Sequence, residues 1–157
     1  MPSTIPKKTG FGSRRRTTEV IAGAVIGGHV IPASLSFTFA QSATQYQTEV
    51  EIAVLNKDGQ VIPAVHALDV YISDDSAGVG LCAVGPSGAV AAKAASGTVL
   101  GVLTAAKAFR AITLSTGKLT MTLQDDATPV LLYVGASIPC IGKVQVSRKT
   151  IAGDYKP

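Results

Sequence analysis

The stretch Lys118-Leu-Thr-Met-Thr-Leu-Gln124 alternates polar and apolar residues along its whole length. A period of two is typical of a β-strand with one face buried and the other in solvent. The same period recurs around Val50, around Leu68 and around Val144. We therefore expect a core that is built from the apolar positions of these runs, namely Val54, Leu68, Val70, Ile72, Leu119, Met121, Leu123, Val144 and Val146.

Residues typical of turns separate the alternating runs. Asn56-Lys-Asp-Gly59 predicts a hairpin connection in which Gly59 takes the left-handed conformation, and Ser115-Thr-Gly117 predicts another turn. The alanine-rich stretch 89–111 favours a helix by propensity, but its glycines and threonines favour strands. Short strands at close spacing predict an all-β fold, an Ig-like antiparallel β-sandwich of about nine strands. We place the strands near residues 34–42, 49–56, 67–73, 89–93, 98–104, 109–115, 118–124, 129–136 and 142–148.

Length and composition favour one globular domain with covered surface. The chain has 157 residues, which is the size of a single ordinary domain. Charged residues make up 15% of it, below the roughly 25% of a typical soluble domain, so we expect partners to cover part of its surface. Tryptophan is absent and aromatic residues make up 5%, which disfavours sites that stack sugars or single-stranded bases.

The net charge of +4 belongs to the N-terminal segment. Residues 1–30 hold five basic residues and one acidic residue, Glu19, whereas the rest of the chain holds nine of each. Prolines and glycines favour an extended path for the basic segment, and it has no strand pattern of its own. We therefore divide the chain into an N-terminal arm, residues 1–33, and a β-sandwich domain, residues 34–157.

The composition of the arm predicts a segment that binds another protein through a basic part and an apolar part. A secretory signal is disfavoured, because Glu19 precedes the apolar run and because Gly27, Gly28, His29 and Pro32 break its continuation. The apolar run is also shorter than the ~20 residues that span a membrane. A nucleic-acid-binding arm remains an alternative, although five basic residues are few for that role. The residues expected to bind a protein partner are Lys7, Lys8, Arg14, Arg15, Arg16, Val20, Ile21, Val25 and Ile26.

No motif for catalysis, cofactor binding or metal binding is recognisable. His29 and His66 stand far apart without a motif around them, and two cysteines do not supply the four ligands of a structural zinc site. We expect Cys82 and Cys140 to be reduced thiols, and His66 to be structural. The pairs Asp74-Asp75 and Asp125-Asp126 lack the spacing of a calcium loop and are expected to cap turns. The sequence therefore predicts a protein that is not an enzyme and has no cofactor.

Several stretches resemble the small Ig-like proteins that tailed bacteriophages encode beside their head genes. Val50-Glu-Ile-Ala-Val-Leu-Asn-Lys-Asp-Gly-Gln-Val-Ile-Pro63 is similar to that family's first strand, polar turn and second strand. Leu68-Asp-Val-Tyr-Ile-Ser-Asp-Asp75 resembles its next strand with an acidic turn. The C-terminal half of that family is similar to three further stretches of this chain, residues 87–97, 113–125 and 142–147. The resemblance covers roughly residues 48–150 and leaves the arm uncovered.

The resemblance implies a virion structural protein assembled in the host cytoplasm. Its expected role is a capsid decoration or cement protein, or a minor capsid subunit, that binds the major capsid protein and itself as a trimer or other symmetric homo-oligomer. The family has no catalytic residues. Alternatives are another virion part, such as a fibre, neck or tail adaptor, or a small-virus coat protein with a nucleic-acid-binding arm. No membrane association is expected.

Overall fold

The computed structural model describes residues 25–26, 29–88, 90–93, 95–125, 128–139 and 141–157, with the backbone alone at residues 25, 26 and 29. The chain divides into two compact units, residues 1–31 and residues 32–157. In the first unit, β1 (Val25–Ile26) pairs antiparallel with β2 (His29–Val30). The sequence predicted no strand in this segment, because two-residue strands are too short to show a period.

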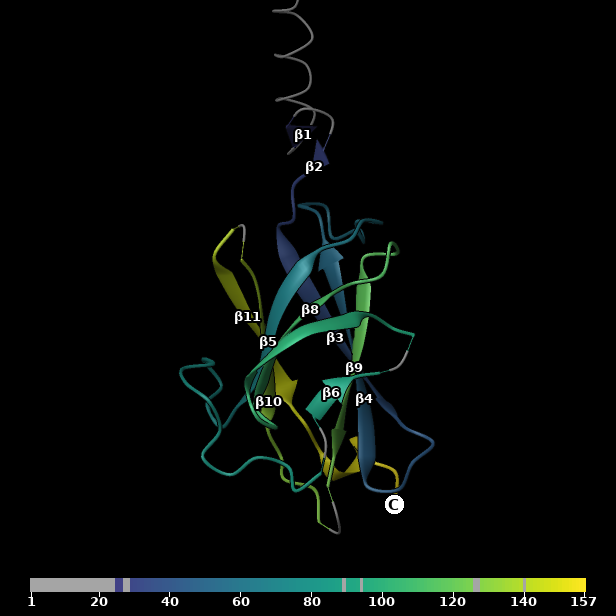
Figure 1. Cartoon of the computed structure of the whole chain (residues 1–157), viewed down its shortest axis with the longest axis vertical. Helices are drawn as coiled ribbons and strands as arrows, with labels where there is room; N and C mark the ends of the chain where they lie inside the picture. Colours follow the sequence, from purple (N-terminus) through teal and green to yellow (C-terminus); the bar gives the residue numbers. More distant parts are fainter. Residues whose placement is uncertain (1–24, 27–28, 89, 94, 126–127, 140) are drawn as a thin grey trace, which may run out of the picture. The chain divides into compact units, whose positions relative to one another are not determined.

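The second unit is a sandwich of two antiparallel sheets (Figure 1). The four-stranded sheet has the order β3-β4-β9-β6, and the five-stranded sheet has the order β11-β10-β5-β8-β7. The described residues contain no α-helix; one turn of 3-10 helix, η1, spans Ala152–Asp154. The strands are β3 (Ser34–Gln41), β4 (Gln47–Leu55), β5 (Ala67–Ser73), β6 (Val90–Ala92), β7 (Thr98–Thr104), β8 (Ala108–Ile112), β9 (Lys118–Gln124), β10 (Tyr133–Ile138) and β11 (Lys143–Lys149).

The expected all-β sandwich is confirmed, and the alanine-rich stretch forms strands as predicted. The largest error in position is β10, which was expected at residues 129–136 and begins at Tyr133. Before it, the chain is held as a loop, because the Asp125 carboxylate accepts a hydrogen bond from the Val130 N–H at 2.8 Å. The Leu132 N–H likewise donates to the Thr150 hydroxyl at 2.9 Å rather than to a strand.

The core lies between the two sheets. Seven of the nine predicted core residues have no exposed surface: Val54, Leu68, Val70, Ile72, Leu119, Met121 and Leu123. Neighbouring strands add further buried side chains to the same cluster, including Phe109 of β8 and Ile138 of β10. Burial of these side chains supplies the main favourable free energy of folding.

The prediction is wrong for the two valines of β11. Val144 is 50% exposed, and Val146 is half-buried. Directly opposed residues share a face, and Gln145 lies opposite the fully buried Ala136, so it is Gln145 that points inward. Its Oε1 accepts a hydrogen bond from the Leu35 N–H of β3, which joins the two sheets at this edge. The two valines therefore fall on the outer face.

A change of register accompanies the altered face. Tyr133 pairs with Lys149 but Gly135 pairs with Val146, so β11 carries one extra residue at this point. Ser147 lies in the irregular part, and its hydroxyl accepts a hydrogen bond from the buried Val134 N–H at 2.9 Å. Ser147 is thus a polar residue at an inward position, where apolar residues are usual.

The C-terminal turn is tied to the sandwich by an ion pair. Two nitrogens of the Arg148 guanidinium contact the two carboxylate oxygens of Asp154 at 2.7 and 2.6 Å. The arginine lowers the pKa of the Asp154 carboxyl, and the same guanidinium lies 4.3 Å from the centre of the Phe39 ring. This network connects η1 to β11 and β3.

Candidate interaction surface

The described charged side chains of the second unit are all engaged within the chain. On the outer face of β4, Glu49 contacts Lys93 at 2.7 Å and Glu51 contacts Lys118 at 2.8 Å. On β5, Asp69 forms a bidentate pair with Arg110 at 2.6 and 2.7 Å. The remaining charged groups pair with each other, bond to backbone groups or lie near an aromatic ring: Lys57, Asp58, Asp74, Asp75, Lys107, Asp125, Lys143, Arg148, Lys149, Asp154 and Lys156. The charges of this unit thus serve its own fold.

Asp74 and Asp75 cap a turn as predicted, and Asp125 joins two loops. The Asp75 carboxylate accepts the Ala77 N–H at 3.0 Å, and the Asp74 carboxylate accepts the Ala83 N–H at 2.6 Å. The Asp125 carboxylate accepts hydrogen bonds from both the N–H and the hydroxyl of Ser87, each at 2.9 Å. Asp126 lies outside the described residues. Among the residues that are described, no group of three or more His, Cys, Asp or Glu side chains could hold a metal ion.

His66 and Cys82 do not form a reactive pair in the structure. Burial lowers the pKa of His66, whose Nε2 is buried and has no hydrogen-bond partner. The backbone of the same residue exchanges hydrogen bonds with Thr113 at 2.9 Å, which fixes the entry of β5. Cys82 is a buried free cysteine, and burial raises the pKa of its thiol. A buried thiol with a raised pKa holds little thiolate, the reactive form. Cys140 and the side chain of His29 lie outside the described residues.

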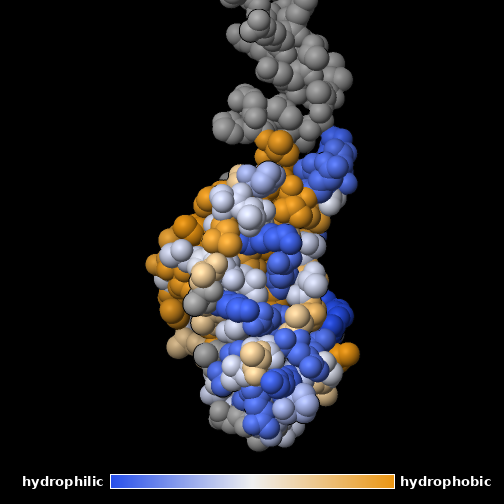
Figure 2. All heavy atoms as spheres, turned by 90° about the vertical axis from the view of Figure 1, so that its right-hand side faces the viewer, coloured by the Kyte–Doolittle hydropathy of each residue, from blue (hydrophilic) through white to orange (hydrophobic). Residues whose placement is uncertain are grey.

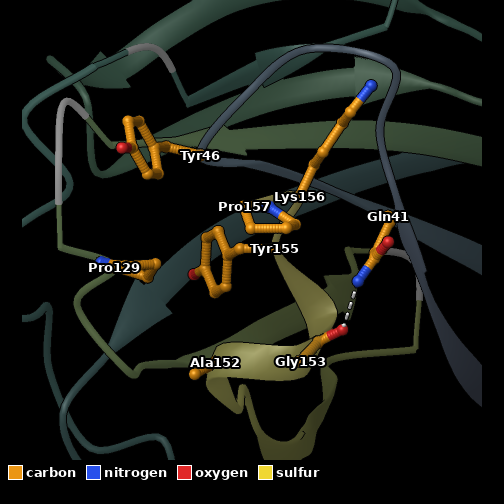
Figure 3. Close-up of a pocket in the computed structure, with 8 residues that line it drawn as sticks. All are labelled: Gln41, Tyr46, Pro129, Ala152, Gly153, Tyr155, Lys156 and Pro157. Carbon is orange, nitrogen blue, oxygen red and sulfur yellow. Dashed lines mark hydrogen bonds between the residues drawn. The ribbon is translucent and has the colours of Figure 1, made fainter.

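A pocket of about 460 Å³ lies beside the C-terminal turn (Figure 3). It is lined by Gln41, Tyr46, Pro129, Ala152, Gly153, Tyr155, Lys156 and Pro157. Three of its polar side chains already bond within the fold: Gln41 donates to the Gly153 carbonyl at 3.0 Å, Lys156 to the Ala43 carbonyl at 2.9 Å and Tyr155 to the Val130 carbonyl at 3.3 Å. Polar groups that would orient a small ligand are therefore largely used in holding the C-terminal segment.

Strand β7 departs from an ordinary domain surface along its whole length. All seven of its residues are exposed, and four of them are large aliphatic residues. We call these four the β7 strip: Val99 is 38% exposed, Leu100 56%, Val102 67% and Leu103 56%. The strand contains no charged residue and no proline. Figure 2 shows apolar residues gathered along the left flank of the body, the side that faces the reader in Figure 1, where β7 crosses in front.

β7 is an edge of its sheet that has neither charged side chains nor proline to prevent pairing. It has a strand neighbour, β8, on one side only. At the other edge of the same sheet, β11 carries Lys143, Arg148 and Lys149 and is held against β3. The edges of the four-stranded sheet are β3 and β6. β3 is covered by its hydrogen bond to β11, and β6 is only three residues long. Charges, short strands and covering contacts normally keep sheet edges from associating, so β7 is the edge best suited to bind another protein.

Most of the expected binding residues of the arm lie outside the part of the chain that the structure describes. Lys7, Lys8, Arg14, Arg15, Arg16, Val20 and Ile21 lie outside the described residues, and Val25 and Ile26 are described by their backbone alone, as β1. The arm therefore stays a sequence-based prediction, whereas the β7 strip is a feature that the sequence did not single out.

Comparisons with protein-family models, with curated protein sequences and with solved structures gave no match to this chain. Within the described residues, no helix has the length and apolar character needed to cross a membrane.

Proposed function

We propose that this protein is a structural subunit of a virion that works by binding other protein subunits. The observation that carries the proposal is the β7 strip, an exposed aliphatic edge on a domain whose described charged side chains all have contacts within the chain. A long exposed strand edge without charges is a ready-made site for pairing with another chain. The resemblance of residues 48–150 to phage head-associated proteins then favours a capsid decoration or cement protein as the specific role. The protein has no catalytic function under this proposal.

The partner in this role is the major capsid protein, and attachment is shared between the domain and the arm. Contacts that are individually weak become strong when many copies bind a repeating shell, because each attached copy raises the local concentration of the next contact. Each described basic side chain of the domain already contacts a carboxylate, a backbone carbonyl or an aromatic ring. These contacts favour a protein partner over nucleic acid, since phosphate recognition needs free basic groups.

The arm supplies the first test of this role. We expect that deleting residues 1–30 leaves the domain folded but abolishes or strongly weakens its binding to pre-formed shells. At roughly 25 cal/mol per Å² of apolar area, even a few hundred Å² around Val20–Ile26 outweighs several exposed ion pairs worth about 0–1 kcal/mol each. Changing Arg14, Arg15 and Arg16 to alanine should therefore weaken binding less than the deletion does, and mainly at low salt, because higher salt screens the ion pairs in the unchanged protein as well. Cosedimentation with shells measures both effects.

Circular dichroism of each variant provides the folding control, and Lys57→Ala provides a charge control. Lys57 forms an exposed pair with its neighbour Asp58, so removing its charge should leave shell binding unchanged. If the deleted protein cosediments with shells as tightly as the full chain, the arm has no part in attachment.

A further inference from the structure

The order of residues along β7 is symmetric about its central glycine. The strand reads Thr98-Val-Leu-Gly-Val-Leu-Thr104, so an aliphatic pair and then a threonine lie on either side of Gly101. If two copies of this strand run antiparallel about a two-fold axis at Gly101, Thr98 of one copy faces Thr104 of the other. Val99 then faces Leu103, Leu100 faces Val102, and Gly101 faces its own equivalent. Each residue thus meets one of its own chemical kind, as a two-fold interface requires.

We propose that the β7 strip is the contact between two copies of this chain, paired antiparallel about Gly101. This inference rests on the proposed function, in which the strip binds a protein, and it names that protein as a second copy. It names a two-fold pair, where the resemblance implied a trimer or other symmetric homo-oligomer.

The irregular register of β7 contributes to the apolar contact. In the pairing of β7 with β8, Val99 lies opposite Ala111, Gly101 opposite Arg110 and Val102 opposite Phe109, so Leu100 has no partner residue in β8. Leu103 is skipped in the same way between Val102 and Thr104. Bulges often protect an edge by twisting it away from a partner. Here the two extra residues are leucines, each 56% exposed, so the bulges add apolar area to the edge.

The size of the strip predicts a weak pair. A fully exposed valine or leucine side chain offers on the order of 100 Å² of apolar area, so four side chains that are about half exposed offer roughly 200 Å² per copy. A standard stable interface buries about 800 Å² per partner. Pairing should therefore depend on concentration in solution and become complete where copies are held close together, as on a repeating shell.

Gly101 allows the pairing to be tested without disturbing the fold. A Cβ atom added at this position meets no other atom within 4 Å, and the backbone there is not in the left-handed region. On the proposed axis, this residue faces its own copy. A charged side chain at Gly101 would therefore meet an identical charge in the pair, whereas it would lie in solvent in the single chain. Two variants of opposite charge would meet favourably when mixed.

The experiment is sedimentation velocity on the full chain over roughly 1 to 500 µM, with wild type, Gly101→Glu, Gly101→Lys and an equal mixture of the two variants. We expect wild type to pair as its concentration rises, and each single variant to pair at least about tenfold more weakly. The mixture should recover most of the lost association. The matched control is Gly153→Glu, because a Cβ at Gly153 also meets nothing within 4 Å and lies on the C-terminal turn. This control should pair like wild type.

Three results would overturn the inference: wild type that stays monomeric throughout, pairing that is unaffected by Gly101→Glu, or lost pairing that the mixture does not recover. The last result would show that Gly101 does not face its own copy in the pair. Shell binding by the same variants separates this inference from the proposed function. A Gly101→Glu protein that binds shells but does not pair supports both proposals, whereas a wild type that pairs but does not bind shells contradicts only the proposed function.

Discussion

Replacing Gly117 by alanine is expected to lower the free energy of unfolding by roughly 3 kcal/mol or more, although the change adds only one methyl group. Gly117 has φ +77°, a left-handed conformation that costs other residues about 1–2 kcal/mol. An added Cβ would also overlap the carbonyl oxygen of Ile62, which is backbone and cannot move aside alone. The Gly117 carbonyl accepts the Val54 N–H at 3.0 Å, so any shift would disturb the end of β4.

Gly59→Ala is the matched control for this prediction. Gly59 has nearly the same conformation, φ +76°, but a Cβ there meets nothing within 4 Å. It should cost about 1–2 kcal/mol, the conformational part alone. Chemical denaturation of both variants measures the difference. Equal losses at the two positions would show that the close approach of Gly117 to Ile62 is not present in the protein.

Leu123→Ala is expected to cost roughly 2–5 kcal/mol through lost apolar burial and the cavity left behind. Leu123 has no exposed surface and lies in β9, between β4 and β6. Its neighbours in the register, Thr48 of β4 and Val90 of β6, belong to strands on both sides and cannot easily close the gap. Urea unfolding monitored by circular dichroism gives the loss directly.

Leu131 provides the comparison for the core substitution, because it is 39% exposed and lies in the loop before β10. Leu131→Ala should cost less than about 1 kcal/mol, since its removal opens little space between packed atoms. A loss below about 1 kcal/mol at Leu123 itself would contradict the assignment of that residue to the core and, with it, the register of β9.

The positions of the strands were largely predictable because the sandwich buries one face of most of them. Residues such as Leu119 and Met121 alternate with polar residues for a physical reason: one side of the sheet meets the other sheet and the opposite side meets water. Turn chemistry was equally informative at Gly59. That residue is left-handed as predicted, and Asn56 caps its turn by accepting the Asp58 and Gln60 N–H groups at 2.9 Å.

Alternation gives a period but does not state which face is buried, and this is why β11 was predicted wrongly. Val144 and Val146 are apolar and were assigned to the core, whereas the inward position belongs to Gln145. The deciding interaction, from the Leu35 N–H to the Gln145 side chain, joins residues 110 positions apart in the chain. A contact of this range has no signature in the local sequence.

The candidate surface was predictable as a strand but not as a surface. Aliphatic residues on both faces of a strand, as in residues 98–104, usually indicate a buried central strand. The order of the sheet decides otherwise, because β7 lies at an edge and β8 covers only one side of it. The signals available in the sequence were the absence of charge and the symmetry about Gly101, and these acquire meaning only once the edge is known.

The proposed role as a structural subunit of a virion is tested most directly by the protein composition of particles that are purified from cells producing this chain. Quantitative mass spectrometry, together with imaging of the same particles, should find many symmetric copies of the chain on the head. When residues 1–30 are deleted, the particles should contain far fewer copies. A few copies at the neck or tail would favour an adaptor in place of a decoration protein. Particles that contain none of the chain, with the protein recovered wholly outside them, would contradict the claim.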